Sequence, residues 1–540
     1  MPIIDSNRQP GSAVANPQRA DGFNLVAAVC VLVLAGIFAV KSLAAWREYP
    51  ESFVDEVIYM EPAWQAVTTG SFANPGIALQ LAGKGVSGLD HSSFLNLPAT
   101  LWIKTPLLWI MGANLRGLRL VDLVIVFAAT ASFAYATRRL AHGWRWLLAV
   151  SVFVLNPIFI WAPPGRPDLL SLLFGLAALG LLLGSRKEGP PKDRDAAFLT
   201  IGVLLGCCAA CHLFGGVYWT VTTTALILAE NSLWRTPREL FLLGVGMAVP
   251  LAANAAWLLH GGAEAWRQFH WLLDLKRTLH RDFVGTLTSA LIQSLGRNPL
   301  VPVVLAFLPW TAIGGQRRLL AAWSLALVAL LVWRCAAFEG YNHAYEVHLW
   351  ASLCCLFAIS LEGMCRSPLP LAARLTRGSL GSGLLALTLI LTGCAMGYNK
   401  WIEAASFNYA RQHRKIRQLV AQSLPPNARI LAGCEAYFLI KQTNVVAMAH
   451  HEKLDLASFD CIVTRSPLIS LSNRDQWFDV LTPAQNAVFQ SSFRLVAEMP
   501  AEALGSPSFP GAYQPGVPGL FVYRRSAADI HPAPSLGARE

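Results

Sequence analysis

Long apolar runs, separated by short polar segments, dominate the first 400 residues of the chain. About eleven of these runs are long enough to cross a bilayer as helices. Their approximate spans are 23–46, 118–137, 146–162, 168–184, 197–213, 216–230, 239–259, 299–314, 319–335, 345–362 and 379–398. The shorter run 97–112 contains Pro98, Lys104 and Pro106, and we expect it to lie in or on the membrane surface. The pattern predicts a polytopic α-helical membrane protein.

After residue 400 the pattern changes to that of a small soluble α/β domain. Helical periodicity near 403–423 and 475–490 alternates with strand-like runs at 428–433, 444–449 and 461–464, then FRLVAEM and LFVYRR. The end of the chain, rich in Pro, Ala and Ser, suits a loose tail. We therefore expect three parts: an N-terminal segment 1–22, a transmembrane module 23–400 with long loops 47–117 and 260–298, and a domain 401–540.

The charged residues predict an orientation. Of the 540 residues, 54% are hydrophobic and 14% are charged, and the formal net charge is +11. The basic residues collect in alternate loops, at 138–145, 186–194, 235–238, 317–318 and 366–377. The positive-inside rule makes those loops and the N-terminus cytoplasmic, and places residues after 400 on the outer face. Because the positive charge follows this topology, it does not indicate a nucleic-acid partner. The first apolar run is too long for a cleavable signal, and we expect it to remain as an anchor.

Cysteines give a second, weaker pattern. Cys207, Cys208 and Cys211, together with His212, have the spacing of a metal site, but they lie in an apolar helical run. Packing of small residues between helices explains them better. Cys434 and Cys461 lie in the soluble region, where they could pair in an oxidising compartment, and the sequence leaves this open.

Two adjacent carboxylates, Asp55 and Glu56, follow the first span in the sequence ESFVDEVIYMEPAW. Charges at a membrane face are costly to place, and carboxylates there can serve in acid–base chemistry. The alternative is a pair of ordinary solvated loop charges.

The motifs around this pair resemble the GT-C superfamily of integral membrane glycosyltransferases, in particular the protein O-mannosyltransferases and the lipid A aminoarabinose transferases. The matching residues are Asp55, Glu56, Tyr59 and Gly70, the KTPL sequence from Lys104, Gly112 with Arg119, the GRPD sequence 165–168, and the segment YNHAYEVH from Tyr341. Thr105 replaces a family proline, and His343 and His348 stand where relatives often have Lys or Arg.

The resemblance implies transfer of one sugar from a polyprenyl-phosphate donor to an acceptor hydroxyl on the outer face, with inversion. It implies Asp55 as general base, with Glu56 and Asp168 as further acidic candidates. Asp168 could equally be an N-terminal helix charge after Pro167. Residues that would bind the donor phosphate are Lys104, Arg119, Arg166, His343, Tyr345 and His348.

Other partners follow from the same reading. The acceptor is a glycolipid, a polysaccharide or a protein, and the setting is a bacterial inner membrane with undecaprenyl or decaprenyl phosphate as carrier. No metal ligands are assigned, and a divalent metal ion stays open as a cofactor. The basic segment 264–281 could cover the site or simply bind the membrane surface. A transporter or flippase of a lipid-linked substrate is the alternative function, although transporters usually place charges near the bilayer midplane.

Overall fold

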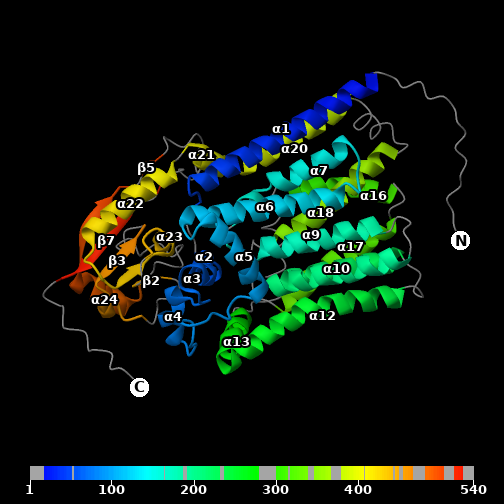
Figure 1. Ribbon diagram of the computed structural model, residues 1–540. Coiled ribbons are helices and arrows are strands. Elements are labelled where there is room, and N and C mark those ends of the chain that lie inside the picture. The colour runs from blue at the N-terminus through cyan, green and yellow to red at the C-terminus, as the bar shows by residue number, and fades with distance from the viewer. Residues whose placement is uncertain are drawn as a thin grey trace, which may run out of the picture.

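Helices make up most of the molecule, and a small sheet domain lies at one end of them (Figure 1). The computed structural model describes residues 18–50, 54–162, 165–185, 191–230, 236–278, 300–313, 317–337, 346–366, 379–406, 408–441, 444–448, 454–465, 481–500, 502–503, 516–517 and 519–526. The helices of the first 400 residues run side by side, and α1 and α20 lie along one edge.

The helices of this part have the following bounds. They are α1 Gln18–Trp46, α2 Val54–Tyr59, α3 Glu61–Thr69, α4 Pro75–Ala82, α5 Pro98–Met111, α6 Leu115–Thr137, α7 Trp144–Leu155, α8 Pro157–Ile160, α9 Asp168–Ser185, α10 Pro191–Cys211, α11 Leu213–Glu230, α12 Thr236–His260, α13 Gly262–Thr278, α15 Leu300–Phe307, α16 Pro309–Ile313, α17 Arg317–Ala337, α18 Glu346–Arg366, α20 Ser379–Met396 and α21 Tyr398–Ser406.

Six described helices are long and apolar enough to cross a membrane, and the bent pair α20 and α21 would make a seventh span. Four shorter apolar helices coincide with the remaining predicted spans. Large apolar side chains such as Leu32, Phe241 and Leu325 are exposed on these helices, as a lipid-facing surface requires. The polytopic helical fold is confirmed, and the count of eleven spans stays a prediction.

Two predicted spans are interrupted at proline. The run 146–162 ends as a helix at Leu155, and α8 restarts at Pro157. In the run 299–314, α15 ends at Phe307 and α16 begins at Pro309. Proline disfavours helical backbone in the residue before it, and therefore the boundary falls there in both cases.

Short helices from the first long loop lie between the helix bundle and the sheet domain. These are α2, α3 and α4, and α5 lies beside α3, α6 and α10. Helix α13 follows α12 and contacts the first loop through Gln268, which is fully buried. Its side chain accepts a hydrogen bond from the backbone N–H of Phe94 and donates to the carbonyls of Ser87 and Ser92. Helix α13, which contains most of the predicted helix at 264–281, therefore packs on the first loop, and residues 279–281 lie outside the described residues.

The C-terminal α/β domain is confirmed. Its elements are α22 Tyr409–Ser423, β1 Ile430–Ala432, α23 Cys434–Tyr437, β2 Val445–Ala447, β3 Cys461–Thr464, α24 Pro483–Ser492, β4 Phe493–Met499 and β7 Leu520–Arg525, with a short 3-10 turn η3 Leu456–Ser458 and a small ribbon of β5 Glu502–Ala503 and β6 Gly516–Val517. The main sheet has the order β2-β1-β3-β7-β4. Strand β1 is parallel to β2 and β3, whereas β7 is antiparallel to β3 and β4.

Two helix boundaries in this domain differ from the sequence prediction. Helix α24 begins at Pro483, because Thr482 caps it and forms a capping box with Gln485; residues 475–480 of the predicted helix lie outside the described residues. The predicted helix 403–423 is two helices, α21 and α22. Cys434 and Cys461 are buried free thiols.

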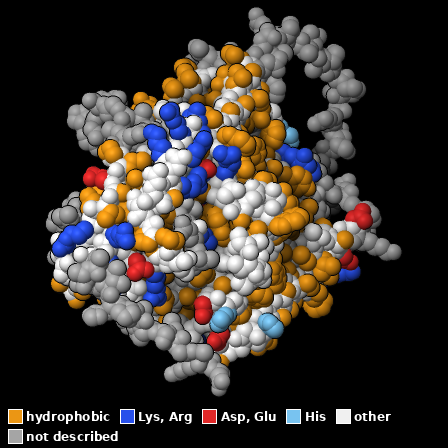
Figure 2. All heavy atoms as spheres, turned by 60° about the vertical axis from the view of Figure 1, so that its left-hand side comes forward, with side chains coloured by type: hydrophobic (Ala, Val, Ile, Leu, Met, Phe, Trp, Pro, Cys, Tyr) orange, Lys and Arg blue, Asp and Glu red, His pale blue; other side chains and the backbone are white. Residues whose placement is uncertain are grey.

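Buried polar contacts join this domain to the helical part. Lys441 forms an ion pair with Glu61 of α3, and His413 of α22 lies 2.9 Å from Glu48. Tyr49 donates a hydrogen bond to Glu403, and its ring contacts Tyr409. Figure 2 shows the domain end of the molecule, with basic side chains gathered on it and hydrophobic side chains spread over the helical part. Helix α22 buries one face and exposes Arg411, Arg414 and Lys415 on the other.

Candidate functional site

Arg166 joins the two carboxylates on which the sequence prediction depends. Its Nη1 donates to Asp55 Oδ2 at 2.7 Å, and its Nε donates to Asp168 Oδ2 at 2.9 Å. Asp55 lies in the first turn of α2 and Asp168 begins α9, so one guanidinium fixes two elements that are far apart in sequence. The side chain of Asp55 is 18% exposed, against 3% for Asp168. Asp55 is thus the carboxylate that a substrate can reach.

Glu56 has a separate and structural environment. Both of its oxygens accept hydrogen bonds from the guanidinium of Arg119, one of them at 3.1 Å. Both side chains are buried, and Arg119 Nε also donates to the carbonyl of Pro50 at 2.6 Å. Adjacent residues on a helix point about 100° apart, which explains why neighbours in sequence have different partners. Arg119 therefore holds α2 against α6.

Lys104 fixes the loop that carries Arg166. Its Nζ donates to the carbonyl oxygen of Gly165, and its side chain is 1% exposed. Burial lowers the pKa of Lys104 to about 8. Among the residues that the structure describes, Lys104 forms no ion pair closer than 4 Å, whereas Arg119 and Arg166 each do.

Gly165 is required by the close approach of this loop to α2. Its backbone has φ +84°, a region that favours glycine. A Cβ at this position would lie 2.5 Å from Met60 Cγ and 3.3 Å from Glu56 Cγ. Only a residue without a side chain lets Arg166 reach Asp55.

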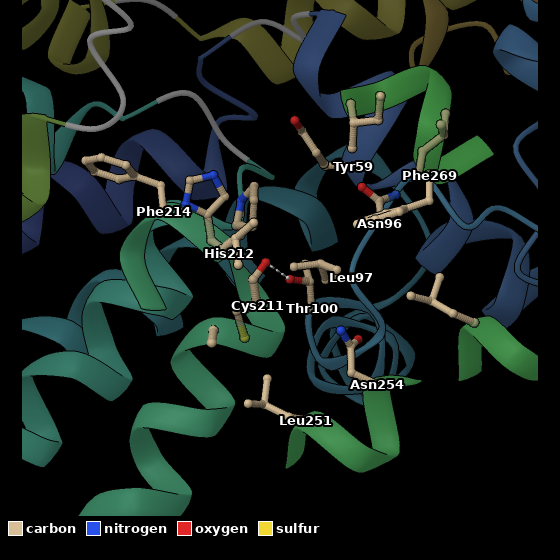
Figure 3. Close-up of a pocket in the computed structure, with 16 residues that line it drawn as sticks. Tyr59, Asn96, Leu97, Thr100, Cys211, His212, Phe214, Leu251, Asn254 and Phe269 are labelled. Atoms are coloured by element: carbon tan, nitrogen blue, oxygen red, sulfur yellow. Dashed lines mark hydrogen bonds between the residues drawn. The ribbon is translucent and has the colours of Figure 1, made fainter. Parts of the chain in front are cut away.

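A mainly apolar cavity of about 210 Å³ opens beside this cluster (Figure 3). Tyr59, one turn after Asp55 on α2, and Pro167, next to Arg166, border it. The opposite walls come from α12 and α13, and the polar lining residues are Tyr59, Asn96, Thr100, His212 and Asn254. Thr100 donates to the carbonyl of Cys211, which fixes α5 against the end of α10. The cavity can take an apolar ligand with its polar end near Arg166.

Asp168, His212 and His348 form a cluster that could hold a metal ion by distance, since one ligand atom of each lies within 4.8 Å of the others. A histidine that binds metal through one ring nitrogen normally donates the proton of the other. His348 does the reverse, because its Nδ1 accepts a hydrogen bond from Trp219 Nε1 at 3.1 Å. Indole is only a donor, so the proton of the neutral ring is on Nε2. With no lone pair left on His348, these residues do not fit a divalent cation.

The structure brings most of the predicted residues together. Asp55, Glu56, Lys104, Arg119, Arg166 and Asp168 form one connected group around α2. His348 lies on the far side of Asp168, fully buried, and it does not line the cavity. His343 and Tyr345 lie outside the described residues.

The sequence analysis did not assign three residues near the site to it, namely His212, Trp219 and Asn254. His212 carried a signal, since it is a polar residue at the outer end of a predicted span, but its neighbouring cysteines directed attention to metal spacing. Trp219 and Asn254 lie inside apolar runs, and nothing in the sequence distinguishes them from packing residues. Cys208 and Cys211 are buried, and Cys208 Sγ lies 3.1 Å from Ser171 Oγ, in agreement with helix packing.

Comparison with known proteins finds similarity in three-dimensional structure but not in sequence. No family model matches the sequence, and no curated protein matches it. The crystal structure of ArnT from Cupriavidus metallidurans bound to undecaprenyl phosphate is similar to this chain, with a TM-score of 0.57 and 12% identity over 93% of this chain and 99% of that chain. The apo state of the same protein gives a TM-score of 0.54, with 13% identity over 93% and 98%. The chain therefore resembles the GT-C glycosyltransferases in fold, as its motifs predict.

Proposed function

We propose that this protein transfers a single sugar from a polyprenyl-phosphate donor to an acceptor hydroxyl at the outer face of the membrane. The observation that carries the proposal is the exposed edge of Asp55, held by Arg166 next to the apolar cavity. In the reaction the acceptor oxygen attacks the anomeric carbon and its proton passes to Asp55. The bond between that carbon and the phosphate oxygen breaks, and polyprenyl phosphate leaves. Displacement in one step inverts the anomeric centre.

The surrounding groups support this chemistry in different ways. Arg166 orients Asp55 and is anchored by Asp168, so that Asp168 serves as an anchor rather than as a second base. Lys104 is our candidate for the donor phosphate, because its charge is not neutralised by a contacting carboxylate in the described part of the chain. Glu56 and Arg119 hold the fold of the site.

The apolar cavity suits a polyprenyl carrier. The side chains that α12 and α13 contribute are apolar except for Asn254. The other polar lining residues come from α2, the start of α5 and the end of α10. ArnT, which has a similar fold, was crystallised with undecaprenyl phosphate. We infer that the carrier lies in this cavity with its phosphate toward Lys104 and Arg166.

We place the site and residues 401–540 outside a bacterial inner membrane, with residues 1–22 in the cytoplasm. Alkaline phosphatase fused after residue 526 is expected to be active, and green fluorescent protein at the same point is expected to be dark. The opposite pattern would contradict this topology.

A transfer assay tests the proposed reaction. Purified wild type and Asp55→Asn would receive a panel of labelled polyprenyl-phosphate sugars, and release of polyprenyl phosphate would be followed. We expect the variant to lose about two to four orders of magnitude in rate, because the base is gone while the side chain keeps its size. Asp90→Asn removes an exposed carboxylate from the same loop and is the matched control, expected to keep the wild-type rate.

Normal turnover by Asp55→Asn would overturn the role of Asp55. A second contrary result is that polyprenyl phosphate is released from none of the donors, while labelled donor still crosses the bilayer of proteoliposomes. That result would favour transport of a lipid-linked substrate as the function.

A further inference from the structure

We propose that His348 is a positioning residue for Asp55, acting through Asp168 and Arg166. The inference rests on the proposed function, in which Asp55 is the base. Hydrogen bonds join Trp219 to His348, and Asp168 through Arg166 to Asp55. His348 and Asp168 belong to one cluster, in which a ligand atom of each lies within 4.8 Å of the other. This chain of groups begins in the helix bundle, on α11 and α18, and ends at the exposed edge of the site.

Trp219 decides which ring nitrogen of His348 carries the proton. The hydrogen bond from its indole N–H to Nδ1, at 3.1 Å, leaves the proton of the neutral ring on Nε2. Trp219 and His348 are both fully buried, so the packing of α11 against α18 maintains this arrangement. His348 therefore presents an N–H donor to Asp168 and His212.

Asp168 has an oxygen that matches this donor. Its Oδ2 accepts from Arg166, whereas Oδ1 is buried, lies 3.7 Å from His212 Nδ1 and forms no hydrogen bond with the described residues. His348 Nε2 is also buried and forms no hydrogen bond with any described residue, and one ligand atom each of Asp168, His212 and His348 lies within 4.8 Å of the others. A buried acceptor and a buried donor in one cluster attract each other, and we infer that Asp168 Oδ1 and His348 Nε2 share a hydrogen bond.

Gly215 provides the space for the His348 ring. A Cβ at this position would lie 3.0 Å from His348 Nε2 and 2.0 Å from Ser171 Oγ. The backbone N–H of Gly215 also donates to His212 Nδ1 at 3.4 Å. The first turn of α11 thus leaves room for both histidines next to Asp168.

Arg166 links His348 to Asp55, because it donates hydrogen bonds to both Asp168 and Asp55. If the N–H of His348 is lost, the buried charge of Asp168 must be balanced more by Arg166, which is then drawn away from Asp55. A carboxylate that loses a neighbouring cation is protonated more readily. The acid side of the activity profile therefore moves toward higher pH, and the rate at its maximum falls.

Three variants test this with the transfer assay. His348→Leu removes the donor, and we expect a loss of about tenfold in kcat, little change in KM, and an acid limb shifted upward by about half to one pH unit. His348→Gln keeps an N–H near the position of Nε2 and should recover most of the rate and of the limb. Tyr218→Phe is the matched control, because it removes a buried 2.7 Å hydrogen bond between the same two helices, to Ser352, and keeps the ring that packs against Trp219 and His348. An acid limb that stays in place in His348→Leu, or moves equally in Tyr218→Phe, overturns the proposal.

A second measurement does not need activity, so it separates this inference from the proposed function. Thermal unfolding in detergent would be followed for His348→Leu, Arg166→Gln and the double variant. We expect the double variant to lose less in its unfolding midpoint than the sum of the single losses, because both residues act on Asp168. Additive losses overturn the proposal even if transfer is confirmed, and coupled losses support it even if no donor is found. One equivalent of tightly bound zinc that disappears in His348→Leu would also overturn it, in favour of a metal site.

Discussion

At the scale of single residues, the partner of a charged side chain indicates its role better than its position in the sequence does. Asp55 and Glu56 are adjacent, yet Glu56 is enclosed with Arg119 whereas Asp55 stays partly exposed beside Arg166. A buried ion pair that loses one partner leaves an uncompensated charge, so the loss of either Glu56 or Arg119 should destabilise the fold. Lys104 differs from Arg119 and Arg166, because its buried ammonium contacts a carbonyl group and they contact carboxylates.

Lys104 gives a prediction about pH. Burial lowers its pKa to about 8, so the ammonium is protonated below that pH and loses its charge above it. Because a neutral amine attracts phosphate weakly, we expect the KM for the donor to rise as the pH increases through 8. Lys104→Arg should abolish this rise, since a guanidinium stays charged, and Lys104→Gln should raise KM at every pH. Initial rates at varied donor concentration from pH 6 to 9.5 decide the matter. A donor KM that rises equally in wild type and Lys104→Arg would assign the titration to another group.

At the scale of elements, proline and glycine decide where helices end and how closely loops approach them. Pro157 and Pro309 are visible in the sequence, and their helix boundaries could have been read from it. Gly165 could not, because its positive φ and its contact with Met60 exist only once the loop is packed on α2. Helix α13 is a similar case, since the basic pattern predicted its helix but not the burial of Gln268 beneath it.

Gln268→Leu tests whether α13 closes the cavity. The change removes three hydrogen bonds to the first loop while keeping the helix propensity. Phe269 and Leu272 of the same helix line the cavity, so loosening α13 should raise the KM for the lipid-linked donor by about threefold to tenfold. The control is Gln418→Leu, which alters an exposed glutamine on α22. An unchanged KM would mean that α13 is a surface helix with no part in donor binding.

At the scale of the whole molecule, the sheet domain and the helix bundle are joined by buried polar contacts near the site. Glu48 follows α1 and contacts His413 and Arg417 of α22. Two residues after Glu48, the carbonyl of Pro50 accepts a hydrogen bond from Arg119. The domain is therefore connected to the residues that hold α2, and its loss would disturb more than its own fold.

The contact at Glu48 predicts a stability that depends on pH. Burial alone would raise the pKa of Glu48, but the hydrogen bond and charge of His413 hold it below the ordinary value of 4.5. A depressed carboxyl pKa contributes stability that is fully present above the unfolded value and is lost as the pH falls through the folded one. Glu48→Gln should lower the unfolding midpoint at pH 7 by about 2–4 °C, with a smaller difference at pH 4. Thermal scans at both pH values measure this, and Glu498→Gln, an exposed change on β4, is the control. An equal difference at both pH values would assign the loss to packing.

The sequence by itself determined the class of fold, because apolar runs of membrane length and strands bounded by turns are local patterns. It also identified the charged residues around α2, since short motifs keep their order along the chain. Only the tertiary structure decided how these charges pair: Arg166 with two carboxylates, Arg119 with Glu56, and His348 behind Asp168. Those contacts join segments separated by 63 and 111 positions, and which of several arginines reaches which carboxylate depends on helix packing that no local pattern contains.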